Sequence, residues 1–557
     1  MIKIEERIPQ KIPGLTSLFI SFVYNKDTIN NILEIIKEHN VYSYNKTTYE
    51  WELPIIELSY LIEHLKYIDD IELKLLECNN NDKKVITKVN YKLQPFKHQL
   101  EAIEYGLKKD SWLLLDKPGL GKTSSIIHLA EELKEQRNLE HCLVICGVNT
   151  LKTNWQEEIA KHSNLSCKIL GKKVNSKGTV TYESVEKRAE QLANKIDEFF
   201  IITNIETFRS DTIVTAFKNS INNIDMIVVD ECHTIKNPNS RQGKNLLKLT
   251  NSKYKIGLTG TLLLNDPLDA YVPLKWIGEE KSNLTTFKQF YCNFVDKQIV
   301  GFKNINVLKE QINNCSLRRT KELLNLPPKT LIDEIVDMSD EHKKLYNDVK
   351  KGIKESVDKV KINNESLRAM LIRLRQATAC PSLLTSQPVT SSKVDRAVDL
   401  AEQIISNGDK VVIFSTFKET VNILNERLKK YNPIILTGDV KDSYVFEMKE
   451  KFQNDEKYKL LIATWQKMGT GVTLNAASYL IFIDTPYTYG VYEQCCDRIH
   501  RIGSKKPVFI YNLICKDTAD ELVQKILARK EAIGDYIIDD VLTENSMEIL
   551  SRYIQDL

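Results

Sequence analysis

The chain has 557 residues, too many for one hydrophobic core, so roughly two to four domains are expected. Apolar residues make up 42% of the composition and charged residues 27%, which is ordinary for a globular protein. The formal net charge is only +3, so the composition shows no basic tail for nucleic acid. Any such surface must be a local patch of the 78 lysines and arginines.

Neither a membrane-spanning segment nor a secretory leader is indicated. Apolar runs have the length of strands, below the about 18 residues of a membrane helix, and residues 1–14 are charged without an apolar stretch. The 11 cysteines include no paired Cys-x-x-Cys pattern, which disfavours zinc and is typical of reduced cytosolic thiols. We expect no signal peptide, no membrane partner and a cytoplasmic location, at the nucleoid or, for a phage protein, in the host.

Residues 1–77 are predicted to form a small α+β module. Helical apolar stripes at 29–36 and 55–67 alternate with strand-like segments in the order β-α-β-β-α-β. The predicted strands are 18–24, 41–44, 49–53 and 71–76. This order is compatible with a ferredoxin-like sheet that carries its helices on one face. The polar residues 78–90 follow as a linker.

Two later blocks alternate strands with helices and are predicted to be α/β lobes with parallel sheets. The first block is 91–279, and the second is 391–540. Their strands are short and continuously apolar, as in sheets buried on both faces. They are expected at 113–116, 142–146, 199–203, 226–229 and 256–259, and at 411–415, 434–436, 460–463, 479–484 and 508–511. Charged helical segments fill 280–390, and 541–557 is a C-terminal tail.

A phosphate-binding loop is predicted at 111–123, which reads Ser-Trp-Leu-Leu-Leu-Asp-Lys-Pro-Gly-Leu-Gly-Lys-Thr. An apolar strand, a glycine loop and a helix aim successive backbone N–H groups and a helix N-terminus at one anion. Lys122 would reach the β- and γ-phosphates of ATP, and the Thr123 hydroxyl would bind Mg²⁺. The loop residues that would line ATP are Pro118, Gly119, Leu120 and Gly121.

One position departs from the phosphate-loop pattern. The pattern begins with Gly or Ala, and this chain has Asp116 there. An ordinary glycine-containing turn is the alternative interpretation of the whole stretch. We favour the phosphate loop because strand, loop, Gly-Lys-Thr and helix agree with one another and because a second motif follows.

That second motif is a pair of carboxylates after the apolar strand 227–229. Asp230 and Glu231 stand at the carboxyl end of a strand downstream of the phosphate loop, which fits metal-assisted phosphoryl transfer. Asp230 would hold Mg²⁺ through water, and Glu231 would orient and polarise the attacking water. A solvated acidic turn is the alternative.

Arginines in the second block supply a third element. Arg498 and Arg501, three residues apart on a predicted helix, would project from one face, and a guanidinium matches phosphate geometry with two parallel bonds. An arginine from a second lobe can raise the rate of phosphoryl transfer by roughly 10³–10⁵. A salt-bridged surface helix is the alternative. The segment Leu258-Thr259-Gly260-Thr261 is a weaker signal. Its hydroxyl groups would link the nucleotide site to other groups, and a plain turn is the alternative.

Together these features resemble the Swi/Snf class of superfamily-two helicase-like ATPases over about residues 91–535. The resemblance implies that Gln99 reads adenine and that Asp230 to His233, followed by Ile-Lys-Asn-Pro, is the family's DEAH-type signature. It also implies coupling roles for His233, Thr259, Thr261 and Gln494, and ATP contact by Gly471. Motif likeness extends to 144–158 on the DNA side and to an inter-lobe brace at 317–329.

Several residues depart from the family pattern. Lys117 and Pro118 differ from the family's phosphate loop, and Leu262 stands where proline is usual. Val445 takes the place of an expected arginine, and Ser504 replaces the last glutamine of His-Arg-Ile-Gly-Gln. The Val445 difference puts one polar contact of the second lobe in doubt, but the ATPase motifs are intact.

The N-terminal module has a weaker likeness. Residues 44–51, Tyr-Asn-Lys-Thr-Thr-Tyr-Glu-Trp, and their flanking helices are similar to the HARP domain of annealing helicases. That resemblance implies a module that directs the motor to branched or forked DNA. A generic α+β module with Trp51 in its core is the alternative.

The family resemblance implies a two-lobed motor that closes on ATP and steps along DNA by gripping its phosphates. The implied DNA contacts are Thr150, Thr203, Ser415, Thr464 and Trp465, although Trp465 is equally suited to packing. The expected function is therefore a DNA-dependent ATPase that translocates on double-stranded or forked DNA and remodels it. A strand-separating DNA or RNA helicase is the alternative, and a non-catalytic nucleic-acid clamp is disfavoured by the intact Lys122 and Glu231.

Overall fold

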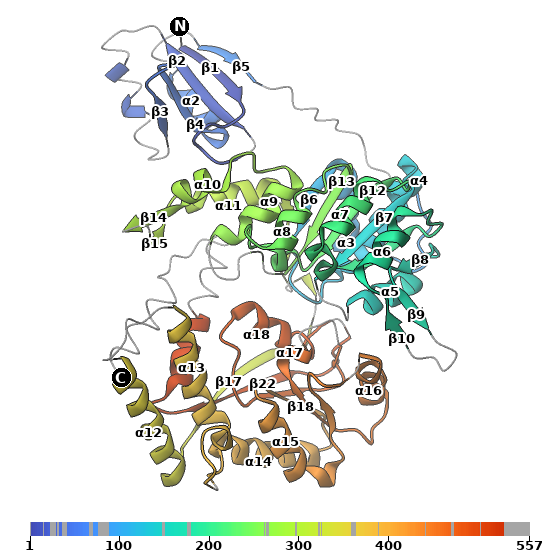
Figure 1. Cartoon of the computed structure of the whole chain (residues 1–557), viewed down its shortest axis with the longest axis vertical. Helices are drawn as coiled ribbons and strands as arrows, with labels where there is room; N and C mark the ends of the chain where they lie inside the picture. The colour runs from blue at the N-terminus through green and yellow to red at the C-terminus, as the bar shows by residue number, and fades with distance from the viewer. Residues whose placement is uncertain are drawn as a thin grey trace. The chain divides into compact units, whose positions relative to one another are not determined.

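The structure is a computed structural model, and it describes residues 2–14, 16–22, 29–30, 33–35, 42–65, 71–75, 88–147, 151–174, 180–260, 262, 267–295, 298–320, 323–324, 326–357, 364–387, 389–440, 442–468, 473–501 and 503–528. The chain divides into two compact units. The first consists mainly of Met1–Asp116 and Gly121–Arg319, and the second of Lys117–Leu120 and Thr320–Tyr536. Each unit has its own parallel sheet (Figure 1). Among these residues, no helix is both long and apolar enough to cross a membrane.

The main sheet of the first unit has seven strands, and every neighbouring pair is parallel. In order they are β16 (Ser316–Leu317), β6 (Ser111–Leu114), β13 (Tyr254–Leu258), β12 (Ile224–Asp230), β7 (His141–Cys146), β11 (Phe200–Asn204) and β8 (Cys167–Ile169). The register aligns Leu114, Leu258, Asp230, Cys146 and Asn204 in one row across their carboxyl ends. The predicted parallel α/β lobe is confirmed, and this row carries the loops of the site.

Helices cover the sheet of the first unit because its strands are apolar on both faces. Residues of α3 (Lys97–Lys108), α4 (Lys122–Arg137) and α5 (Leu151–His162) pack with alternate strand residues such as Val144 and Val228 in one core. The remaining helices are α6 (Val185–Ala193), α7 (Asp211–Lys218), α8 (Arg241–Leu246), α9 (Tyr271–Ile277), α10 (Leu284–Tyr291) and α11 (Ile305–Asn314). The first unit also contains two antiparallel strand pairs. One is β9 (Lys172–Val174) with β10 (Val180–Tyr182), and the other is β14 (Cys292–Val295) with β15 (Gln298–Phe302).

The N-terminal module is α+β but differs from the ferredoxin-like arrangement predicted for it. Its sheet has the order β3 (Ser43–Asn45), β4 (Glu50–Pro54), β2 (Ser17–Phe22), β1 (Ile2–Arg7), β5 (Ile71–Lys74), and it carries α2 (Leu58–Leu65). Strand β2 pairs antiparallel with β1 and with β4, and β1 stands between β2 and β5. In a ferredoxin-like sheet of the four predicted strands, β2 and β5 would be direct neighbours. The unpredicted β1 forms because Ile2 and Ile4, both fully buried, alternate with charged residues.

The second unit contains a six-stranded parallel sheet, as predicted. Its order is β17 (Lys329–Val336), β22 (Val508–Cys515), β21 (Tyr479–Phe482), β18 (Val411–Ser415), β20 (Leu460–Thr464) and β19 (Ile434–Leu436). The helices are α12 (Asp340–Val357), α13 (Asn364–Ala379), α14 (Ser392–Ser406), α15 (Lys418–Arg427), α16 (Asp442–Asn454), α17 (Trp465–Met468) and α18 (Tyr489–Cys496).

The segment 280–390 contains helices and also gives one edge strand to each sheet. Strand β16 joins the sheet of the first unit and β17 joins that of the second. Edge strands are hard to find in the sequence because one side pairs with nothing and their side chains stay exposed. Leu331 and Ile335 of β17 are more than half exposed, so β17 lacks the continuous burial of the inner strands.

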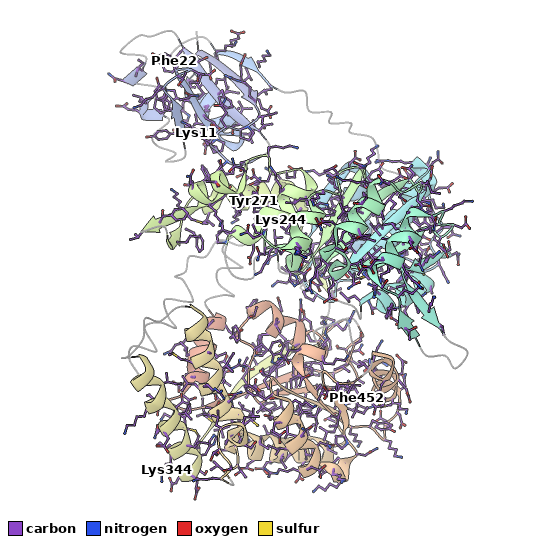
Figure 2. All side chains as sticks on the ribbon, in the orientation of Figure 1. Lys11, Phe22, Lys244, Tyr271, Lys344 and Phe452 are labelled. Carbon is purple, nitrogen blue, oxygen red and sulfur yellow. The ribbon has the colours of Figure 1, made fainter. Side chains whose placement is uncertain are left out.

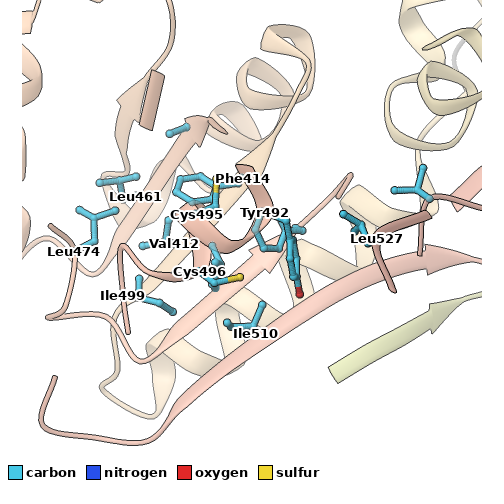
Figure 3. Packing of buried hydrophobic residues seen from close by; sticks show 14 of the residues in the cluster. Val412, Phe414, Leu461, Leu474, Tyr492, Cys495, Cys496, Ile499, Ile510 and Leu527 are labelled. Carbon is cyan, nitrogen blue, oxygen red and sulfur yellow. The ribbon is translucent and has the colours of Figure 1, made fainter. Parts of the chain in front are cut away.

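The core of the second unit has two layers, one on each face of the sheet. Val412, Phe414 and Leu461 point into the layer that contains Cys495 and Cys496 (Figure 3). Val411 and Ile413, which alternate with them, point into the layer formed with α14 and α15. Burial on both faces explains why these strands are apolar without a period of two.

Removing one large side chain tests this core. Phe452 of α16, labelled in Figure 2, is fully buried, whereas Tyr444 of the same helix is 44% exposed. We expect Phe452→Ala to lower the free energy of unfolding by about 3–5 kcal/mol, because lost burial and a new cavity add together. Tyr444→Ala should change it by less than about 0.5 kcal/mol. Urea unfolding followed by circular dichroism measures both, and equal losses would contradict the burial of Phe452.

Candidate active site

The phosphate loop runs from the end of β6 into α4 and requires glycine at two positions. Gly119 and Gly121 have φ values of 91° and 80°, in the left-handed region that side chains rarely adopt. A Cβ on Gly121 would also lie 2.3 Å from Nε2 of Gln99 and 2.9 Å from Oγ of Ser124. The loop therefore keeps a bare backbone where α4 begins, which is the arrangement that exposes N–H groups to an anion.

Lys122 and Asp116 are held together at this loop. The Nζ of Lys122 donates a hydrogen bond to the backbone carbonyl of Asp116 at 2.8 Å. The Asp116 side chain is fully buried and accepts from Nε and Nη2 of Arg319, at 3.0 and 2.6 Å. The residue that departs from the usual Gly or Ala is thus one half of a buried ion pair.

Gln99 of α3 lies against the same loop. Its Oε1 accepts from the Phe96 backbone N–H at 2.9 Å, and its Nε2 donates to Oγ of Ser124 at 3.0 Å. Ser124 in turn donates to the Gly121 carbonyl at 2.8 Å. Gln99 is only 4% exposed, so the structure brings it to the phosphate loop through the first turn of α4. Its role as adenine reader stays a prediction.

Asp230 ends β12, and its carboxylate is buried and fully oriented. Oδ2 accepts from the indole N–H of Trp155 at 2.8 Å, and Oδ1 accepts from the Glu231 N–H at 2.9 Å. Burial raises the pKa of Asp230 to about 6, and the negative charge of Glu231 adds to the rise. The Trp155 hydrogen bond and the positive charge of Lys122 act in the opposite direction. Asp230 and Lys122 therefore share one electrostatic environment.

Glu231 adopts a conformation that few non-glycine residues take, with φ 52° and ψ 52°. Such a backbone costs about 1–3 kcal/mol and persists where the surroundings enforce it. A Cβ on Gly147, after β7, would lie 2.9 Å from the Glu231 Cβ, so a glycine there makes room for this turn. This left-handed turn follows directly on Asp230, the last residue of β12.

His233 connects two motifs that the sequence predicted separately. Its Nδ1 lies 3.2 Å from Oε2 of Glu231 and 2.9 Å from Oγ1 of Thr259, which follows β13 and is fully buried. The structure thus brings His233 into contact with both Thr259 and Glu231, and the coupling role of His233 and Thr259 stays a prediction. Thr261 lies outside the described residues.

In the second unit, Arg498 and Arg501 do not lie on a helix, so that prediction is wrong. Helix α18 carries Gln494, which is half-buried, and it ends at Cys496. The chain then tightens into turns, because the Arg498 N–H bonds to Cys495 O and the Arg498 carbonyl accepts from the Leu474 N–H at 2.7 Å. The two arginines are presented by this turn. Gly471 lies outside the described residues.

Hydrogen bonds to hydroxyl groups hold the turn after α18 in place. Arg501 Nη1 donates to Oγ1 of Thr473 at 2.8 Å, and its backbone N–H donates to Oγ of Ser504 at 3.1 Å. Ser504 donates to the Ile499 carbonyl at 2.8 Å, and His500 Nε2 lies 2.9 Å from the Pro327 carbonyl. Ser504, which stands where the family has glutamine, therefore has a definite role in holding the turn.

Three of the side chains predicted to touch DNA are buried. Thr203, Ser415 and Thr464 are at most 6% exposed. The Ser415 hydroxyl donates to Asp484 at 2.6 Å, and the indole N–H of Trp465 donates to Oγ1 of Thr416 at 2.8 Å. These side chains hydrogen-bond within the protein, and their contact with DNA stays a prediction. Thr150 lies outside the described residues.

Sequence reasoning missed three residues that organise the site. Trp155 orients Asp230, Arg319 pairs with Asp116, and Arg375 of α13 donates to Asp484 at 3.1 Å inside the second unit. Trp155 and Arg319 lie within segments that resembled family motifs, and the charged Asp116 at a glycine position was a further signal. No sequence period predicts which partner each of them takes.

Comparisons with known proteins match both units. Residues 44–383 match the family described as the SNF2-related domain, and residues 393–503 match the helicase conserved C-terminal domain. An uncharacterized ATP-dependent helicase of Mycoplasma pneumoniae is 27% identical over 493 residues, which cover 86% of this chain and 45% of that protein. The DNA annealing helicase and endonuclease ZRANB3 of Bos taurus is 26% identical over 471 residues, covering 80% of this chain and 40% of that protein.

The chain spans less than half the length of these two curated relatives. A solved structure, the Sulfolobus solfataricus SWI2/SNF2 ATPase core in complex with dsDNA, covers 84% of this chain and 97% of its own. Its sequence identity is 24% and its TM-score is 0.37.

The Trp155–Asp230 hydrogen bond gives a testable prediction. Trp155→Phe keeps an aromatic side chain but removes the donor that orients a predicted Mg²⁺-binding carboxylate. We expect the Mg²⁺ concentration for half-maximal ATP turnover to rise about tenfold. Trp112→Phe is the matched control, because Trp112 is equally buried and contacts Tyr105 instead of a carboxylate. A magnesium titration of turnover measures both, and equal shifts would contradict the role of Trp155.

Proposed function

Because the chain belongs to the SNF2-related family of helicase-like ATPases, we propose that it hydrolyses ATP and uses the energy to translocate on and remodel double-stranded or forked DNA. One observation carries the ATPase part: the phosphate loop, Asp230 and the Glu231–His233 pair lie at the carboxyl edge of one parallel sheet. This edge is where open α/β sheets bind nucleotides.

The residues at this edge fit ATP and Mg²⁺. The positive φ values of Gly119 and Gly121 leave the backbone bare for phosphate oxygens, and Lys122 stands at the first turn of α4. Thr123 and Asp230 offer oxygen ligands, which Mg²⁺ prefers, and bound Mg²⁺ would neutralise charge on the phosphates. The described residues contain no cluster of three His, Cys, Asp or Glu side chains, so phosphates and water would supply the other ligands.

Glu231 is the proposed general base and water-positioning group. Its backbone has a positive φ directly after β12, and Nδ1 of His233 lies 3.2 Å from its Oε2. His233 also reaches Thr259, so a change at β13 would act on Glu231 through one imidazole. Arg498 and Arg501 are proposed to stabilise the charge on the transferred phosphate.

DNA is the proposed partner, and forked DNA and strand annealing are the finer part of the proposal. The relative from Bos taurus is named a DNA annealing helicase, and residues 44–51 resemble the HARP domain of such proteins. A motor that contacts only the phosphates of DNA has no preference for particular base sequences. Strand separation on DNA or RNA is the second candidate, because the relative from Mycoplasma pneumoniae is named a helicase.

One panel of assays tests the proposal. ATP turnover is measured with duplex DNA, forked DNA, single-stranded DNA and RNA, with strand displacement and annealing assayed on the same substrates. We expect duplex or forked DNA to stimulate turnover most and Lys122→Ala to abolish it while leaving much of the DNA binding intact. Turnover driven by RNA alone would overturn the DNA assignment. Wild-type turnover in Lys122→Ala would overturn the site.

The arginine proposal has its own test. We expect Arg501→Ala to lower kcat by about 10³-fold or more, with ATP binding changed only a few-fold, because the guanidinium acts on the transition state. Arg427→Ala is the control, since this arginine of α15 pairs with Asp395 at the surface. A steady-state titration of ATP separates kcat from KM. If only KM changes in Arg501→Ala, the finger assignment is wrong.

A further inference from the structure

The buried pair between Asp116 and Arg319 has no counterpart in a phosphate loop that begins with Gly or Ala. Two nearly parallel bonds join the groups, Nε to Oδ1 at 3.0 Å and Nη2 to Oδ2 at 2.6 Å. Asp116 is fully buried and Arg319 is 8% exposed, while Glu101 lies 3.5 Å from Nη1 of Arg319. Arginine suits this geometry because its guanidinium is planar and forked.

The register of the sheet brings the two residues together. Edge strand β16 runs parallel to β6, with Ser316 opposite Leu113 and Leu317 opposite Leu114. The backbone N–H of Leu115 also donates to the Leu317 carbonyl at 2.8 Å. Continuing this register by two residues places position 319 beside position 116. The pair therefore lies just beyond the end of β6, where the chain enters the phosphate loop.

Both the carboxylate and the backbone carbonyl of Asp116 accept hydrogen bonds from cationic side chains. Arg319 binds its carboxylate, and Lys122 Nζ donates to its backbone carbonyl at 2.8 Å. The peptide that Lys122 contacts is thus the peptide that Arg319 fixes. Arg319 is also the final residue of the first unit before the chain enters the second at Thr320. One ion pair therefore joins the first residue of the phosphate loop to the residue at which the chain leaves the first unit.

We propose that Arg319 is a positioning residue for the phosphate loop: it fixes Asp116 and, through the Asp116 carbonyl, the ammonium group of Lys122. This inference rests on the proposed ATPase function, but a measurement of nucleotide binding is enough to test the role of Arg319. It assigns to Arg319 an effect on ATP affinity and on stimulation by DNA, because the same residue begins the crossing between the units.

Three variants separate positioning from simple stability. Arg319→Met leaves a buried carboxylate without its guanidinium, and Asp116→Gly leaves a buried guanidinium without its carboxylate. The double variant removes both charges and gives the loop the usual glycine. If the pair served stability alone, the double variant would recover both the unfolding midpoint and ATP binding. Positioning predicts that it recovers the midpoint while ATP binding stays at least about tenfold weaker than in the wild type.

Arg319→Lys keeps the charge and removes the fork, so it tests the same idea with little risk of misfolding. We expect it to weaken binding of a fluorescent ATP analogue about three- to tenfold and to raise KM for ATP more than it lowers kcat. The ratio of DNA-stimulated to basal turnover should also fall. Arg137→Lys is the matched control, because Arg137 faces Asp110 at 3.4 Å, at the opposite end of β6.

The outcomes are distinct. Wild-type nucleotide affinity in folded Arg319→Lys, or full recovery of affinity in the double variant, would overturn the positioning role. An equal loss in Arg137→Lys would overturn it too, since the effect would then belong to any arginine–carboxylate pair. If the wild-type protein binds the analogue but hydrolyses no ATP, the proposed function fails while the role of Arg319 in binding still stands or falls on the affinities.

Discussion

The parallel register of β6, β13, β12 and β7 is the constraint on which the candidate site depends. It places the carboxyl ends of four strands in one row, from Leu114 through Leu258 and Asp230 to Cys146. The phosphate loop, Thr259, the Glu231 turn and Gly147 follow these ends directly. A one-residue slip would turn Asp230 to the other face of the sheet.

Buried polar groups then fix the details at this edge. Asp230 is oriented by Trp155 and by its own neighbour's N–H, while Asp116 is oriented by Arg319. Each of these carboxylates sits where water has little access, so each needs a specific donor. The second unit follows the same rule, since Asp484 accepts from Ser415 and Arg375. Both units therefore hold their loops by paired buried charges and hydroxyls.

The inner strands and the phosphate loop could be predicted from sequence because their signals are local. Continuous apolar runs identified the nine inner strands of the two lobes and the edge strand β19, and Gly-Lys-Thr identified the start of α4. The edge strands β8, β16 and β17 escaped, since a strand with one unpaired side needs less apolar sequence. The helix expected to carry Arg498 and Arg501 ended early, because the Arg498 carbonyl bonds to a residue far along the chain, Leu474.

The sequence by itself determined the α/β class, the phosphate loop, the Asp230–Glu231 pair and the family, since each is encoded in a short run of neighbouring residues. Tertiary structure alone decided that Trp155 donates to Asp230 and that Arg319 pairs with Asp116. It also decided that Ser415 donates to Asp484 and Trp465 to Thr416. The physical reason is distance along the chain. The partners of these groups lie tens to hundreds of residues away, so only the packing of strands brings donor and acceptor together.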